Sequence, residues 1–321
     1  MATFDITLSQ LQAAAATIYK HITPTPQISW PLLNERCACE VWVKHENHLP
    51  TGAFKVRGGI WYVENLNKES PEIDKVITAT RGNHGQSVAY ATRMKGIKAI
   101  VVVPHGNNAD KNRAMLAYGV ELIEHGDDFN EAKDHAQKLA QQRRLHMFPS
   151  IHSWLIQGVA SYSLELLKAA PALDTVYVPV GMGSGICGMI AVRNALGVKT
   201  DIVGVVAANA PTYALSFEQQ KPIAADSADT LADGLAVRVP DPQALEYMLN
   251  NVERIVTVSE EDILAAIHYY FTDTHNVAEG AGASPLAALL KEKDSLQGKK
   301  AGVILSGGNI DQSLFERALR S

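Results

Sequence analysis

The chain has 321 residues, of which 46% are hydrophobic and 20% charged, and this composition excludes an intrinsically disordered protein. A formal net charge of −5 argues against nucleic acid or an anionic membrane as the main partner. Three cysteines are too few for a disulfide scaffold, so we expect reduced thiols and a cytoplasmic protein. The first ten residues lack the apolar core of a signal peptide, and no apolar run is long enough for a membrane span.

Hydrophobic periodicity predicts the secondary structure in chain order. Thr7 and Gln10 have the spacing of a capping box ahead of an alanine-rich helix that ends near Lys20. After it, short β-branched runs alternate with longer helical stretches. The predicted strands span 39–45, 75–80, 98–104, 120–125, 174–180, 201–207, 254–258 and 300–306. Helices are expected to begin near Asn83, Ala109 and Phe129, and Ser259 caps a further helix that has acids in its first turn.

Strands as continuously apolar as these, with helices between them, indicate parallel sheets covered on both faces. The predicted fold class is therefore α/β, with two doubly wound parallel-sheet lobes. The break between the two series of strands falls near 149–153. In such folds, ligands bind beyond the carboxyl ends of the strands.

A glycine cluster, Gly181 to Gly188, directly follows the predicted strand 174–180. Glycines let backbone N–H groups close around an anion, and the start of a helix adds a favourable partial charge, so the cluster predicts a phosphate cradle. A tight turn without a ligand is the alternative. The spacing also matches a dinucleotide fingerprint, but the next strand has its only acid, Asp201, at its beginning, which disfavours a nicotinamide cofactor.

A second candidate is Lys55, which follows Phe54 just inside a predicted helix start. A lysine that loses water in a pocket has a lowered pKa, which suits a Schiff-base amine. The alternative is a solvated lysine on a helix face. His45 and His48 do not have the spacing of a zinc motif, and we interpret them as structural.

Two more motifs follow predicted strands. In the segment 78–87, Asn83 and His84 open a helix whose backbone amides suit a carboxylate, although Asn83 could simply cap that helix. In the segment 305–309, the Ser306 hydroxyl either faces a heteroatom of a ligand or caps the final helix. A lysine, an anion cradle, a carboxylate loop and a hydroxyl together suit pyridoxal phosphate acting on an amino acid.

These motifs resemble those of the fold-type-II pyridoxal-phosphate enzymes, in particular the threonine/serine dehydratase and serine racemase branch. PTGAFKVRGG resembles the family's PTGSFKxRGA, which implies that Lys55 forms the Schiff base and Phe54 packs by the cofactor ring. RGNHG resembles SGNHG, which implies that Asn83 binds the ring hydroxyl. The resemblance also implies that the surrounding loop holds the substrate carboxylate, through Thr80, Arg81, Gly82 and His84.

The remaining motifs complete the implied cofactor site. GMGSG resembles the phosphate loop of the family, which implies phosphate binding by Gly181, Met182, Gly183, Ser184 and Gly185. LSGGN matches directly and implies that Ser306 faces the pyridine nitrogen. The resemblance further implies a tryptophan synthase β-like fold with a large cofactor-binding domain, 1–66 and 154–321, and a small mobile domain, 75–152.

The activity implied is β-elimination from a 3-hydroxy-L-amino acid, with L-threonine and L-serine first, to give a 2-keto acid and ammonia. The family also implies a homodimer or tetramer. Phenylserine, hydroxyaspartate and a hydroxyectoine-derived substrate remain open, because the chain also resembles dehydratases for bulkier substrates. A non-catalytic sensor that keeps the cofactor and a nicotinamide-dependent oxidoreductase are the two competing hypotheses from different classes.

Two departures from the family pattern refine this prediction. Arg81 stands where racemases carry a serine, so we expect weak racemisation. Arg81 either adds a charged fork toward a substrate carboxylate, favouring longer or acidic substrates, or turns outward to a surface acid. Val206 and Thr212 stand where the racemase-like branch has metal-binding acids, so we expect no structural metal there.

Overall fold

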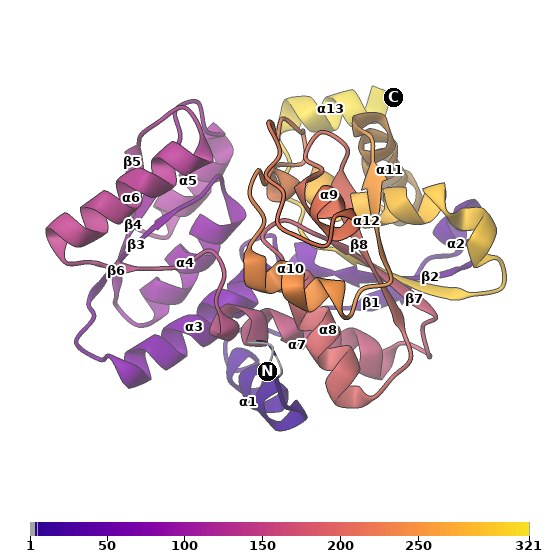
Figure 1. Ribbon diagram of the computed structural model, residues 1–321, viewed down its shortest axis with the longest axis horizontal. Helices are drawn as coiled ribbons and strands as arrows, with labels where there is room; N and C mark the ends of the chain where they lie inside the picture. The colour runs from indigo at the N-terminus through magenta and orange to yellow at the C-terminus, as the bar shows by residue number, and fades with distance from the viewer. Residues whose placement is uncertain (1–3, 5, 321) are drawn as a thin grey trace.

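The computed structural model describes residue 4 and residues 6–320 (Figure 1). Its strands are β1 (Gln27–Ser29), β2 (Glu40–His45), β3 (Lys75–Ala79), β4 (Lys98–Val103), β5 (Glu121–Glu124), β6 (His146–Met147), β7 (Thr175–Pro179), β8 (Asp201–Ala207), β9 (Arg254–Val258) and β10 (Lys300–Leu305). Its α-helices are α1 (Leu8–Ile18), α2 (Pro31–Cys37), α3 (Lys55–Glu69), α4 (Asn83–Met94), α5 (Ala109–Ala117), α6 (Phe129–Arg143), α7 (Ser153–Ala169), α8 (Ser184–Leu196), α9 (Thr212–Glu218), α10 (Pro242–Leu249), α11 (Glu260–Thr274), α12 (Gly280–Lys291) and α13 (Gln312–Arg320). Short 3₁₀ turns are η1 (Glu46–His48), η2 (Asp233–Leu235) and η3 (Lys293–Leu296).

The strands form two sheets, which confirms the predicted α/β fold class. One sheet has six strands in the order β1-β2-β10-β7-β8-β9, and the other has four in the order β5-β4-β3-β6. Every pairing is parallel except that of β1 with β2, which is antiparallel at the edge of the larger sheet. All strands of the smaller sheet lie between residues 75 and 147. The domain boundaries given above stay a prediction.

Helices cover the sheets on both faces, which is why central strands such as β4 and β8 are buried along nearly their whole length. Figure 1 shows the smaller sheet with α5 and α6 on the left, the larger sheet on the right, and α3 and α7 near the junction. Helix starts follow the predictions: α4, α5 and α6 begin at the expected residues, and capping boxes at Thr7 and Ser259 open α1 and α11. In the described part of the chain, no helix is long and apolar enough to cross a membrane.

Helix α3, which begins with Lys55, lies in backbone contact with its neighbours. A Cβ atom on Gly158 of α7 would approach the carbonyl oxygen of Arg57 to 2.6 Å. On the other side, a Cβ on Gly59 would approach the Ser87 hydroxyl of α4 to 2.3 Å. Ser87 Oγ donates a 2.7 Å hydrogen bond to the Lys55 carbonyl. Glycine is therefore required where α3 crosses α4 and α7, and these contacts fix the position of Lys55.

A cluster of buried charged side chains also holds helix α3 in place. We call Lys44, Glu46, Arg57 and Glu165 the ion cluster. The Arg57 guanidinium, fully buried, contacts Glu46 Oε2 and Glu165 Oε1 at 2.6 Å each, and Lys44 also pairs with Glu165. Two cations thus face two anions, and the cluster joins β2, η1, α3 and α7 with no net charge.

Candidate active site

Four loops meet beyond the carboxyl ends of the strands. They are the segment before α3, the β3–α4 loop, the β7–α8 loop and the segment after β10. The first and last are joined directly, because the Phe54 N–H donates to the Ser306 carbonyl at 3.0 Å and the Gly308 N–H donates to the Gly52 carbonyl at 2.9 Å. Lys55 is therefore held next to the end of β10.

Lys55 is the amine of this site. Its Nζ lies 4.8 Å from the centroid of the Phe54 ring. Burial lowers the pKa of the Lys55 ammonium to about 8, and the negative charge of Glu279 partly opposes this shift. This ammonium therefore loses its proton at a lower pH than that of a solvated lysine.

The glycine loop has the form of an anion cradle. Gly183 has a φ of +97°, a left-handed conformation that favours glycine. A Cβ on Gly181 would lie 2.2 Å from the Gly234 carbonyl oxygen. The N–H groups of residues 181–185 donate to no other group in the described part of the chain, and these residues lead into and form the first turn of α8. Such free amides at a helix N-terminus bind phosphate.

The cradle is connected to Phe54. The Tyr162 hydroxyl donates to the Gly185 carbonyl at 3.0 Å, and the Tyr162 ring meets the Phe54 ring edge-on at 5.9 Å between centroids. Ser184 is buried in the first turn of α8, and the Met182 carbonyl accepts a hydrogen bond from Tyr213. The structure thus brings the amine, an aromatic face and the cradle into one site.

Asn83 is held by two residues from the other lobe. Its Nδ2 donates to Glu279 Oε1 at 2.7 Å, and its Oδ1 accepts from Asn309 Nδ2 at 2.8 Å. Asn83 is the first residue of α4 and not its N-cap, which is Gly82, so the capping alternative is wrong. These two hydrogen bonds fix the orientation of the Asn83 amide, and its contact with a cofactor stays a prediction.

The other residues of the β3–α4 loop shape the turn. Thr80 Oγ1 accepts from the N–H groups of Gly82 and Gly85 at 3.0 and 3.3 Å. His84 Nε2 lies 3.2 Å from Thr78 Oγ1, and burial, with the nearby Lys55 charge, lowers the His84 pKa to about 3. The His84 ring is therefore neutral. The assignment of these loop residues to a substrate carboxylate stays a prediction.

Arg81 faces an acid at the rim of the site. Its Nε lies 3.9 Å from Asp233 Oδ1, and its side chain is 43% exposed. Lys111 of α5 approaches the other oxygen of Asp233 to 2.6 Å. Asp233 belongs to η2 in the larger lobe, so one carboxylate joins two cations of the smaller lobe. Two alternatives were open for Arg81: contact with a substrate carboxylate, or an outward turn to a surface acid. This geometry corresponds to the second.

Ser306 ends β10, and its side chain is buried. Its hydroxyl has no hydrogen-bond partner among the described residues, and α13 begins six residues later, at Gln312. The alternative in which Ser306 caps the final helix is therefore wrong.

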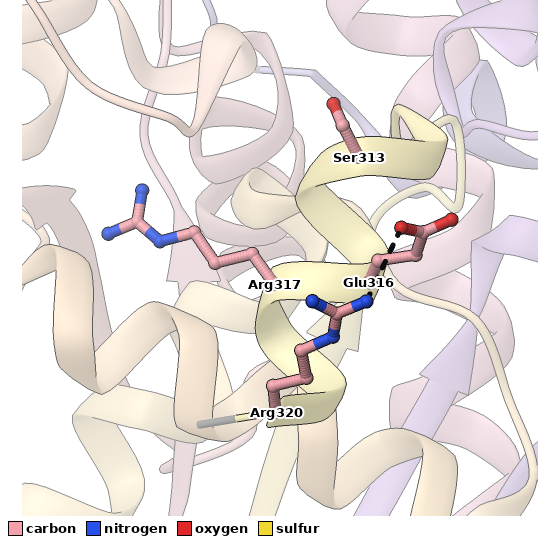
Figure 2. Close-up of a pocket in the computed structure, with 4 residues that line it drawn as sticks. All are labelled: Ser313, Glu316, Arg317 and Arg320. Atoms are coloured by element: carbon pink, nitrogen blue, oxygen red, sulfur yellow. Dashed lines mark ion pairs between the residues drawn. The ribbon is translucent and has the colours of Figure 1, made fainter.

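Sequence reasoning missed Glu279, Asp233, Lys111 and the role of Asn309. All four line a cavity of about 270 Å³, together with Leu231, Gly234, Gly280, Ala281, Ile310, Asp311 and Leu314. A larger, open pocket of about 440 Å³ lies on α13, where Arg320 pairs with Glu316 (Figure 2). That pocket is formed by one surface helix and is separate from the strand ends.

The structural interpretation of the histidines near β2 agrees with their contacts. His45 is fully buried, accepts a 3.1 Å hydrogen bond from Trp30 Nε1 and stacks on His48 at 5.2 Å between centroids. Among the residues that the structure describes, no three or more His, Cys, Asp or Glu side chains are grouped to hold a metal. The expectation of no metal at Val206 and Thr212 stays a prediction.

The family model described as "Pyridoxal-phosphate dependent enzyme" matches residues 18–307. The chain belongs to this family of pyridoxal-phosphate dependent enzymes. The predicted cofactor and the predicted enzyme class are thereby confirmed.

Relatives within the family are similar over nearly the whole chain. An L-threonine ammonia-lyase of Thermotoga maritima is 32% identical over 317 residues, which are 98% of this chain and 78% of the relative. A solved threonine deaminase, the processed form of isoform 2 from Solanum lycopersicum, has a TM-score of 0.90 and 27% identity, covering 98% of this chain and 92% of the other. A solved pyridoxal 5'-phosphate-dependent aspartate racemase has a TM-score of 0.91 and 27% identity, covering 98% of each chain.

The residues of the site fit the family's cofactor. The free amides of 181–185 would hold its phosphate, Lys55 its aldehyde carbon, Asn83 its ring hydroxyl and the unpartnered Ser306 hydroxyl its ring nitrogen. Glycine is required at 181, because a Cβ there would meet the Gly234 carbonyl oxygen, so this position presents only backbone to the cradle. When bound, pyridoxal phosphate supplies an electron sink for negative charge that develops at the substrate Cα.

Proposed function

We propose that this protein is a dehydratase, or ammonia-lyase, that converts a 3-hydroxy-L-amino acid to a 2-keto acid and ammonia, with L-threonine and L-serine as its substrates. The observation that carries the proposal is Lys55, an amine of lowered pKa between an aromatic ring and the end of β10. Relatives named L-threonine ammonia-lyase and threonine deaminase support the same reaction.

Different residues of the chain would place the substrate and accept its proton during elimination. The substrate carboxylate would be placed by the loop 80–84, where the Thr80 hydroxyl already organises the backbone. The neutral Lys55 amine would accept the proton that leaves Cα. The 3-hydroxyl departs from Cβ and takes up a proton, so the substrate loses one water. The enamine that remains is hydrolysed to a 2-keto acid and ammonia.

Release of 2-keto acid tests this proposal. Cofactor-loaded protein is expected to form 2-oxobutanoate rapidly from L-threonine, and Lys55→Ala is expected to form none. No product from any 3-hydroxy amino acid, with an intact cofactor spectrum, would instead support a non-catalytic sensor. No product from threonine or serine, but turnover of phenylserine, hydroxyaspartate or a hydroxyectoine-derived substrate, would replace the substrate assignment.

The ion pairs around Asp233 favour amino-acid substrates whose side chains are small and uncharged. Its carboxylate already faces both Arg81 and Lys111, so a second substrate carboxylate would have to compete with it. Racemisation is expected to be weak, since arginine replaces the serine of racemases at position 81. Accumulation of D-serine from L-serine at a rate comparable to elimination would contradict this.

The cellular setting is part of the proposal. Cys37, Cys39 and Cys187 are free and buried, which supports a protein of a reducing compartment such as the cytoplasm. We infer a homodimer or tetramer from the family alone. Light scattering on the purified protein would measure its mass, and a monomer would contradict this inference.

A further inference from the structure

Glu279 is a buried acid whose charge acts on Lys55, and it has no ion-pair partner in direct contact among the described residues. It precedes α12 as its N-cap residue, and its side chain is only 7% exposed. A Cβ on Gly307 would lie 2.5 Å from its Oε1, so the carboxylate lies against the backbone that follows Ser306. Its direct side-chain partner is the Asn83 amide, at 2.7 Å. Buried carboxylates are usually paired with a cation, so this arrangement needs an explanation.

The charged groups around Glu279 come from three elements. Lys55 lies on α3, Lys111 on α5 and Asp233 on η2, and Asp311 lines the same cavity. Burial raises the pKa of Glu279 to about 7, the two lysines lower it and Asp233 raises it. Lys111 is already in contact with Asp233 at 2.6 Å. Lys111 acts more strongly on Glu279 than Lys55 does, but Lys55 has no ion pair within the described residues, and Glu279 is the charged group that acts on its ammonium.

Glu279 also fixes the orientation of Asn83. The Asn83 Nδ2 donates to Glu279 Oε1, and the ionised form of that carboxylate offers the amide only acceptors. On the other side, the Asn309 amide donates both to Asn83 Oδ1 and to the Thr51 carbonyl, at 2.8 Å each. The Asn83 amide is thereby held in one orientation, and its second N–H remains for an acceptor such as the ring hydroxyl of the cofactor.

We propose that Glu279 is a positioning residue for this active site: its carboxylate, buried against the backbone at Gly307, orients the Asn83 amide and supplies a counter-charge to the Lys55 ammonium. The role goes beyond the proposed function, because it depends on Lys55 as the reactive amine and not on any substrate. A carboxylate that merely caps α12 would orient Asn83 without affecting the titration of Lys55.

Cofactor loading at different pH values separates these roles. The protein is stripped of cofactor and mixed with pyridoxal phosphate, and the visible absorbance of the new Schiff base gives the loading rate. Lys55 must be unprotonated to attack the aldehyde, so the midpoint of the rate–pH profile reports its titration. Glu279→Gln keeps an oxygen that accepts from Asn83 but removes the charge. Since a negative neighbour stabilises the ammonium, the midpoint is expected to fall by about one pH unit, and loading below the midpoint to become about tenfold faster.

Two variants make the comparison specific. Glu279→Asp keeps the charge and is expected to keep the wild-type midpoint. Glu292→Gln removes a half-buried carboxylate elsewhere in the larger lobe, which pairs with Arg254 and Tyr177, and is expected to leave the midpoint unchanged. If Glu279→Gln loads too slowly to follow, carbamylation of Lys55 by cyanate at each pH, read by mass spectrometry, gives the same midpoint.

The outcomes decide the proposal without reference to turnover. An unchanged midpoint in folded Glu279→Gln would overturn it, as would an equal shift in Glu279→Asp. Because the measurement uses no amino acid, absence of 2-keto acid production would contradict the proposed function and leave this result standing.

Discussion

Replacement of Arg57 by methionine tests whether the ion cluster stabilises the fold. Four hydrogen bonds of the guanidinium go to oxygens of Glu46 and Glu165, and none of these three side chains is more than 8% exposed. The cluster is neutral, so Arg57→Met leaves one uncompensated negative charge out of contact with water. Breaking a buried pair in this way costs about 3–5 kcal/mol, and we expect the free energy of unfolding to fall by that amount.

Urea denaturation followed by circular dichroism measures this change. Arg320→Met is the matched control, because that arginine is 82% exposed and pairs with Glu316 only at 4.0 Å, and it should change the free energy by less than ~0.5 kcal/mol. In the double variant Arg57→Met/Glu165→Gln the charges of Lys44 and Glu46 balance again. The double variant should therefore lose less free energy of unfolding than Arg57→Met and Glu165→Gln lose together, by ~1 kcal/mol or more. A loss below ~1 kcal/mol in Arg57→Met, or strict additivity, would refute the reasoning.

Three further outcomes are expected. Asp233→Asn releases Lys111 and Arg81, so the ratio of kcat/KM for a 3-hydroxy dicarboxylate to that for threonine should rise about tenfold, and an unchanged ratio would show that these cations do not reach the substrate. Gly158→Ala places a methyl group against the backbone of α3 and should lower the free energy of unfolding by about 1–3 kcal/mol in a urea titration. The Glu165 pKa, which burial would raise, is held below its usual value by the stronger effect of Arg57 and Lys44, so the unfolded chain binds more protons in acid. The melting temperature should consequently decline as the pH falls below about 4, and Glu165→Gln should flatten that decline.

Local sequence signals account for most of the fold. The runs that became β4, β8 and β9 are continuously apolar and β-branched, and the Ser259 capping box marks a helix start independently of any distant contact. The short strands β1 and β6 were missed because three and two residues carry no periodicity. Those strands exist only because β2 and β3 present edges with which they pair.

The same distinction applies to the active site. Lys55 could be recognised because it lies in a short motif at a predicted helix start, and Asn83 and Ser306 because each lies in a short motif near the end of a predicted strand. Glu279 could not be recognised in this way, because it and its partner Asn83 are 196 residues apart in the sequence. Its burial also depends on the packing of both lobes. The one local signal was an acid directly before the small-residue run that starts α12, and such acids are common at helix N-termini.

The position of β10 between β2 and β7 affects how the protein is made on the ribosome. The smaller sheet is continuous in the chain, so its four strands can pair as soon as residue 147 has been synthesised. The larger sheet cannot be completed until much later, because β10, the parallel neighbour of β2, begins only at Lys300. At ordinary elongation rates of roughly 5–20 residues per second, β2 spends roughly 13–51 s without that neighbour. During this interval one lobe can already be folded while the other exposes an unpaired apolar edge, which makes the nascent larger lobe the part most in need of a chaperone.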